Sequence, residues 1–130
     1  SEFLWLRHKA GLSNTQFQQP IGNVAHQVAC HQRVQNIGLK SRDVLNLIQE
    51  SNEVAHERCS GHDGTYAVKK ETRAKSVKIA KPTVRKVDEQ NPDHFISDCP
   101  MAGTQIAHLA QNVDKAEHPM TLLRMAYGLN

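Results

Sequence analysis

Residues 58–65 read Arg-Cys-Ser-Gly-His-Asp-Gly-Thr, and the rest of the chain is arranged around this stretch. The short run 54–56 leads into it, and a lysine-rich helical pattern that begins near Tyr66 leads out of it. A glycine on each side of the His-Asp pair leaves the backbone free to adopt positive φ or to approach a ligand closely. The pattern predicts a strand, a tight glycine turn and a helix.

The same strand-to-turn pattern occurs twice more in the chain. Residues 23–29 run into Cys30, and residues 94–98 run into Cys99. The chain contains three cysteines, and each of them ends a predicted strand. Three strand–helix repeats imply parallel strands joined by right-handed crossovers, and ligands collect outside the carboxyl ends of such strands. We therefore expect Cys30, Cys59 and Cys99 at one edge of a sheet.

The remaining patterns complete an α/β domain with a short parallel sheet of three or more strands flanked by helices, and a thiol site at the strand ends. Pro82 is expected to open a new helical segment, because proline breaks a hydrogen bond in a helix interior. The expected strands are 24–29, 53–58 and 94–98, and the expected helices are 2–9, one that begins near 39–41, 66–80, the segment opened by Pro82, one with Ile106, Leu109 and Val113, and one from Pro119 to a stop at Gly128.

Composition limits the class of protein. The 130 residues are 38% hydrophobic and only 5% aromatic, which predicts one domain with a lean core that packs against more protein or holds a cofactor. No run approaches the roughly 18 apolar residues of a membrane span, and no signal peptide is visible. Three cysteines favour reduced thiols in a cytosolic compartment over a disulfide scaffold. Because the chain begins at Ser1 without an initiator Met, we expect it to be part of a longer protein.

The thiols predict a metal or iron–sulfur site. Thiolates are the standard ligands of iron–sulfur clusters and common ligands of zinc, and both kinds of site usually take four protein ligands. The chain supplies three cysteines and no Cys-x-x-Cys pair, so His31, His62 or a segment outside the chain would complete the set. Asp63 would either hold a histidine in one tautomer or form an Asx turn with Gly64.

Thiol catalysis is an alternative for the same turn. Cys59 is followed by His62 and Asp63, a thiol, imidazole and carboxylate set. A helix N-terminus lowers the pKa of a thiol, which favours a nucleophile.

Polyanion binding is a third hypothesis. A basic stretch, relieved only by Glu71, would give strongly salt-dependent affinity for a phosphate backbone. No aromatic residues interleave with it for base stacking, so a solvated helix face or a docking surface for an acidic redox partner is the simpler interpretation. The stretch consists of Lys69, Lys70, Arg73, Lys75, Lys78, Lys81, Arg85 and Lys86.

Three longer stretches carry a family resemblance. Residues 26–38, 58–66 and 97–103 resemble the cysteine-rich (CCG) domain of Fe–S oxidoreductases, a family that includes the C subunit of anaerobic glycerol-3-phosphate dehydrogenase and the B subunit of heterodisulfide reductase. Residues 118–128 and the N-terminal helix 2–9 also resemble that family. The resemblance implies that residues 1–130 are a single domain of this type, a C-terminal part of a longer Fe–S oxidoreductase subunit.

The resemblance also implies a function and its residues. Such domains hold a [4Fe–4S] cluster, a noncubane cluster or zinc, and Cys30, Cys59 and Cys99 match cluster-ligand positions. From the residue types alone, Gly61, Gly64 and Asp63 would support the site. The implied role is electron transfer beside other redox subunits or domains, in the cytoplasm or peripherally on the inner face of the membrane, without nucleic acid.

The chain departs from the family pattern at two places. The paired Cys-Cys-Gly of the family reads Cys59-Ser60-Gly61, and its Cys-x-x-Cys reads Cys99 to Ala102. The five-thiolate set of a noncubane cluster is therefore absent from this sequence.

Overall fold

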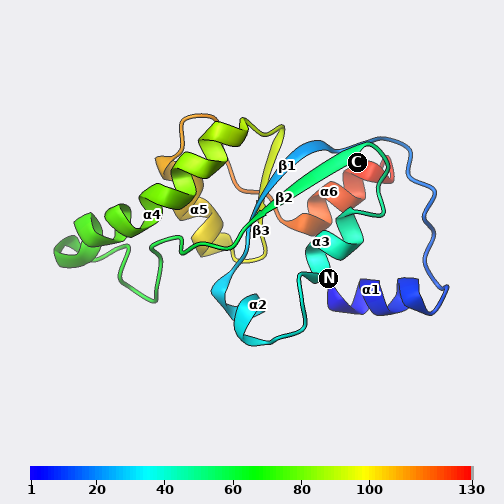
Figure 1. Cartoon of the computed structure of the whole chain (residues 1–130), viewed down its shortest axis with the longest axis horizontal. Coiled ribbons are helices and arrows are strands. Elements are labelled where there is room, and N and C mark those ends of the chain that lie inside the picture. The colour runs from blue at the N-terminus through cyan, green and yellow to red at the C-terminus, as the bar shows by residue number, and fades with distance from the viewer. Residues whose placement is uncertain (130) are drawn as a thin grey trace.

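The structure is a computed structural model that describes residues 1–129, and Figure 1 follows the chain from its N-terminus to its C-terminus. The elements in chain order are α1 Glu2–Lys9, β1 Gly22–Gln27, α2 Cys30–Val34, α3 Lys40–Leu45, β2 Ser51–His56, α4 Lys70–Gln90, β3 His94–Ser97, α5 Pro100–Leu109 and α6 Pro119–Ala126.

The three strands form one parallel sheet in the order β2-β1-β3. β1 is the central strand: it pairs with β2 from Gly22↔Ser51 to Gln27↔His56. On its other side it pairs with β3 through residues 24–27. The predicted α/β class, with a short parallel sheet flanked by helices, is confirmed.

Helices cover both faces of this sheet, so the domain has three layers. In Figure 1, α4 and α5 lie on one side of the strands and α3 and α6 on the other. Alternate residues of β1 and β3 enter the two cores, because successive side chains of a strand point to opposite faces. The core under α3 and α6 contains Ile21, Val24, Leu45, Ile48, Ile96, Leu122 and Ala126. The core under α4 and α5 contains Ala25, Ala80, Val87, Phe95, Ile106 and Ala107.

The predicted strands are confirmed in place, although each ends one or two residues earlier than expected. The pairing of β1 does continue past its last residue, since the Val28 amide donates to the His56 carbonyl at 3.1 Å. Ala29 is then the extended N-cap residue of α2. The turn toward the helix therefore uses residues that the apolar pattern alone assigns to the strand.

The prediction for α4 is wrong in detail. The structure has one helix from Lys70 to Gln90 with Pro82 inside it, where the sequence predicts a helix over 66–80 and a new segment at Pro82. The buried residues Ala80 and Thr83 flank the proline on the side that faces the sheet, while Pro82 itself is exposed. Packing on both sides of the proline thus outweighs its missing hydrogen bond.

Helices α1 and α6 agree with the sequence, whereas α2 was not predicted as a separate helix and α5 differs at one end. α1 has the predicted bounds, and Gly11 follows it with φ +71°. α6 begins at Pro119, and Gly128 follows its end with φ +70°. α5 ends at Leu109, so Val113 lies outside the helix in which it was expected.

Candidate functional site

The three cysteines follow three neighbouring parallel strands, as the sequence predicts. Cys30 is the first residue of α2, Cys59 lies in the loop between β2 and α4, and Cys99 is the N-cap residue of α5. All three are free thiols; Cys30 and Cys59 are exposed and Cys99 is half-buried. The carboxyl edge of the sheet therefore presents a thiol on each of its three loops.

Helix α4 holds the Cys59 loop through small polar side chains. Thr83 Oγ1 donates to the Cys59 carbonyl at 2.7 Å, and Ser76 Oγ donates to the Gly61 carbonyl at 2.6 Å. The Gly61 amide donates to Cys59 Sγ at 3.4 Å. These contacts fix the backbone from Cys59 to Gly61.

Gly61 is required by this arrangement. Its φ is +74°, and a Cβ built on it would lie 2.2 Å from the Ser76 carbonyl oxygen. Gly64 also has a positive φ, of +51°, but nothing lies within 4 Å of its Cβ position. The predicted positive φ is thus found at both glycines, while only Gly61 has the close approach. Their support of a cofactor stays a prediction.

The residues beside the thiols do not gather around a common point. His31 is exposed on α2, His62 is half-buried, and Asp63 is exposed. The Asp63 carbonyl accepts the Tyr66 amide at 2.8 Å, which makes a local turn. Within residues 1–129 no group of three or more His, Cys, Asp or Glu side chains is placed to hold a metal ion. The ligand roles of Cys30, Cys59, Cys99, His31 and His62 therefore stay predictions.

A buried polar network, which the sequence analysis missed, joins the loops that carry Cys59 and Cys99. Gln27, at the end of the central strand, is fully buried. Its Nε2 donates to the Arg58 carbonyl at 3.3 Å, and its Oε1 accepts from Ser97 Oγ at 2.9 Å. The same Ser97 oxygen accepts the Cys99 amide at 3.1 Å. The polar residues at the carboxyl ends of β1 and β3, Gln27 and Ser97, were the one sequence signal of this network.

A second buried network crosses all three strands on the opposite face of β1. His26 is fully buried in β1, between Glu53 of β2 and Asp98 just after β3. Its Nδ1 lies 2.6 Å from Glu53 Oε1, and its Nε2 lies 3.3 Å from Asp98 Oδ2. When His26 is protonated, both of its ring nitrogens donate, one to each carboxylate.

The pKa shifts of this network follow from its contacts. Burial alone would lower the pKa of His26, but the hydrogen bonds and negative charges of Asp98 and Glu53 outweigh burial and raise that pKa above 6.5. Burial would likewise raise the pKa of Asp98, but the hydrogen bonds from His26 and Ser41 lower it from 3.8 to about 2. Ser41 Oγ of α3 donates to this carboxylate at 2.7 Å. Asp98 thereby ties the start of the Cys99 loop to β1 and α3.

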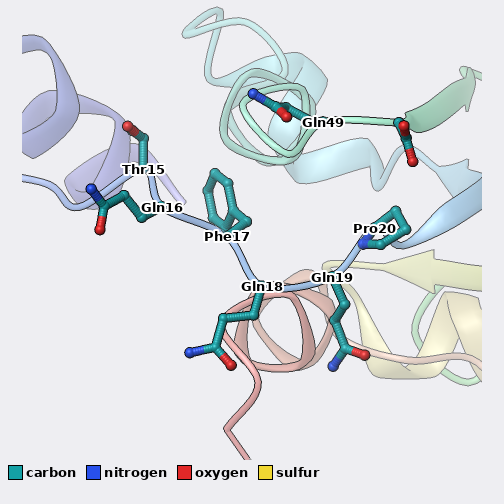
Figure 2. Close-up of a pocket in the computed structure, with 8 residues that line it drawn as sticks. Thr15, Gln16, Phe17, Gln18, Gln19, Pro20 and Gln49 are labelled. Carbon is teal, nitrogen blue, oxygen red and sulfur yellow. The ribbon is translucent and has the colours of Figure 1, made fainter.

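Two cavities differ in their relation to the thiols. One, of about 440 Å³, is lined by residues 15–20 with Gln49 and Glu50. Figure 2 shows that the Phe17 ring points toward the segment that carries Gln49. It includes none of the cysteines. The other, of about 360 Å³, also includes none of the cysteines, but it is lined by His62 and Val68 of the loop after Cys59 and by Met101 of α5. The second cavity is therefore the one that adjoins the candidate site.

Comparison of the chain with protein-family models, with curated protein sequences and with solved structures finds no match. Within residues 1–129, none of the helices is both long and apolar enough to cross a membrane. The residues described above and the resemblance of residues 26–38, 58–66 and 97–103 are thus the basis for a functional proposal.

Proposed function

We propose that this chain is an electron-transfer module of an iron–sulfur oxidoreductase, with Cys30, Cys59 and Cys99 as thiolate ligands of a [4Fe–4S] or related metal site. The observation that carries the proposal is the position of the three thiols, one on each loop at the carboxyl edge of adjacent parallel strands. The resemblance of the same loops to the CCG domain supports it.

The residues present do not form a complete site by themselves. Three thiols are one fewer than the four ligands that such clusters usually take, and no preformed group of ligands exists within residues 1–129. We therefore propose a shared site, in which other redox subunits or domains of the same complex supply the remaining ligand. A cytoplasmic location, free in solution or peripheral at the inner face of the membrane, belongs to the same proposal.

Reconstitution of the purified chain tests this proposal. The chain is incubated without oxygen with ferric iron, sulfide and excess 2-mercaptoethanol, which reduces part of the iron and substitutes for a missing thiolate ligand. We expect iron and sulfide to bind in equal amounts with broad visible absorption, because three protein thiolates and one external thiol complete a cluster. Each of the variants Cys30→Ser, Cys59→Ser and Cys99→Ser is expected to lose most of this absorption.

Lys115→Ser is the control, because its side chain is exposed and lies outside the thiol loops. Zinc bound without sulfide, and lost in the same cysteine variants, would replace the redox role by a structural zinc site. A folded chain that binds neither iron with sulfide nor zinc would overturn the proposal that these thiols are ligands.

A further inference from the structure

Helix α4 presents a strongly basic face to solvent. It contains seven Lys and Arg residues and three acidic ones, a net charge of +4 that exceeds the +3 of the whole chain. We call the exposed cations on its outer surface the α4 basic face: Lys70, Lys75, Lys78, Lys81, Arg85 and Lys86. Arg73 is not part of this face, because its Nη1 donates to Gln105 Oε1 of α5 at 2.6 Å.

Little within the described chain neutralises this charge. Arg85 forms an ion pair with Glu89 at 3.6 Å, and both side chains are more than half exposed. The lysines of the α4 basic face have no ion pair within residues 1–129. Exposed pairs such as Arg85–Glu89 are weak, so the face keeps most of its positive potential.

The opposite face of the same helix holds the candidate site. Ser76 and Thr83 are buried and bind the backbone of the Cys59 loop. An α-helix with its side chains is about 10–12 Å across, so a molecule bound to the α4 basic face lies about one helix width from that loop. Binding on this surface therefore brings a partner close to Cys59 without covering the thiol.

An apolar cavity lies beside the N-terminal end of α4. Val68 and Met101 line it and remain 70% and 55% exposed. The remaining lining includes His62 from the Cys59 loop and Pro100 next to Cys99. Protein interfaces combine an apolar centre with a polar, charged rim. Here the apolar cavity would be the centre, and Lys69 and the α4 basic face, which directly follow Val68 in the sequence, would be the charged rim.

We propose that the α4 basic face and this cavity form the docking surface for an acidic electron-transfer protein, which inserts one apolar side chain into the cavity. This inference rests on the redox function proposed above. Opposite charge on the two surfaces guides encounter and orientation. A protein fits better than a nucleic acid, since α4 has no Phe, Tyr or Trp on which bases would stack. It also fits better than a membrane surface, since Ile79 is the one large apolar residue of α4 that is exposed.

The test uses a fluorescein-labelled, glutamate-rich peptide with one central Trp as a model of the acidic partner. Its binding to the apo chain is followed by fluorescence anisotropy at low and at physiological salt. The triple variant Lys75→Glu, Lys78→Glu, Lys81→Glu is expected to weaken binding on the order of tenfold at low salt, because attraction becomes repulsion. The matched control is Lys9→Glu, Arg42→Glu, Arg124→Glu, which makes the same change in net charge away from α4.

A second pair of measurements tests the cavity. Val68→Ser is expected to weaken binding of the Trp peptide several-fold and to leave binding of a peptide with Ser in place of Trp unchanged. Equal loss of affinity in the two charge variants would overturn the proposal. So would tighter, α4-dependent binding of a single-stranded oligonucleotide or of phosphatidylserine vesicles. Because the chain is used without metal, the docking result does not depend on the reconstitution experiment. The α4 triple variant should still incorporate iron and sulfide, whereas a chain that binds peptide but incorporates no iron would contradict the redox role alone.

Discussion

His26 makes protonation part of the stability of the fold. The ring is fully buried between Glu53 and Asp98, and one oxygen of Glu53, Oε2, is buried without a hydrogen-bond partner within residues 1–129. His26 is thus the one basic group between two acidic side chains. Removing His26 would leave both carboxylates without their cation, which would be strongly destabilising.

The free energy of unfolding is expected to be greatest at mildly acidic pH. The pKa of His26 is raised in the folded state, so its contribution is complete below the unfolded value of 6.5 and is lost as the pH rises through the folded value. The pKa of Asp98 is lowered from 3.8 to about 2, so its contribution is complete above 3.8 and is lost as the pH falls toward 2. Urea unfolding should therefore give the highest free energy of unfolding between pH 3.8 and 6.5, where both contributions are complete.

The variant Asp98→Asn tests whether this pH dependence comes from the contact between His26 and Asp98. It should lower the free energy of unfolding at pH 5 by about 2 kcal/mol, the scale of a hydrogen bond to a charged group, because His26 and Glu53 remain paired. It should also lower the pKa of His26, measured by the NMR shift of its ring protons. Asp63→Asn removes an exposed carboxylate and should change neither quantity. Equal behaviour of the two variants would contradict the role assigned to Asp98.

At the scale of elements, the contact between the Cys59 loop and α4 depends on a glycine. Gly61→Ala should destabilise the fold by about 3 kcal/mol, because it adds a left-handed backbone cost to a clash with the Ser76 carbonyl. Gly64→Ala has the backbone cost without the clash and should lose only about 1 kcal/mol. Urea unfolding of the two variants measures the difference, and equal losses would mean that the loop does not pack closely on α4.

A substitution at Pro82 of α4 is expected to stabilise the protein rather than destabilise it. Pro82→Ala should stabilise the protein by about 1–2 kcal/mol, because alanine restores a helix hydrogen bond while the unfolded chain gains some conformational freedom. Pro82 is exposed, so no packing is lost. Thermal unfolding checks this against Lys81→Ala, an exposed neighbour that should stay within about 0.5 kcal/mol of the parent. An unstable Pro82→Ala would show that the ring makes a needed contact.

The elements whose signals are local were the ones predictable from sequence. Gly11 after α1, Pro119 at the start of α6 and the apolar runs of the strands each determine structure within a few residues. The continuation of α4 through Pro82 depends instead on burial of Ala80 and Thr83 against distant parts of the chain. A local rule for proline has no access to that packing.

At the scale of the whole molecule, the parallel sheet and its thiol-bearing edge followed from three strand–helix repeats, but the buried networks did not. His26 meets Glu53 and Asp98 across 27 and 72 residues of sequence. Gln27 meets Ser97 across 70 residues. Such pairs depend on strand order and register, and a shift of one residue would send each side chain to the other face. Their chemistry is visible only once the sheet is assembled.

The position of β1 predicts how stability is distributed over the molecule. β1 pairs on both sides, and Val24 and Ala25 are fully buried. α1 has no buried residue. Native-state hydrogen exchange should therefore find the amides of β1 opening only with global unfolding, while those of α1 exchange at least roughly a hundredfold faster through local fraying. β2 belongs between these limits, because it pairs with β1 on one side only and Asn52 and Val54 are exposed. If α1 were protected as strongly as β1, its exposed Phe3 and Leu6 would have to be covered in solution, which would indicate that the chain associates through that helix.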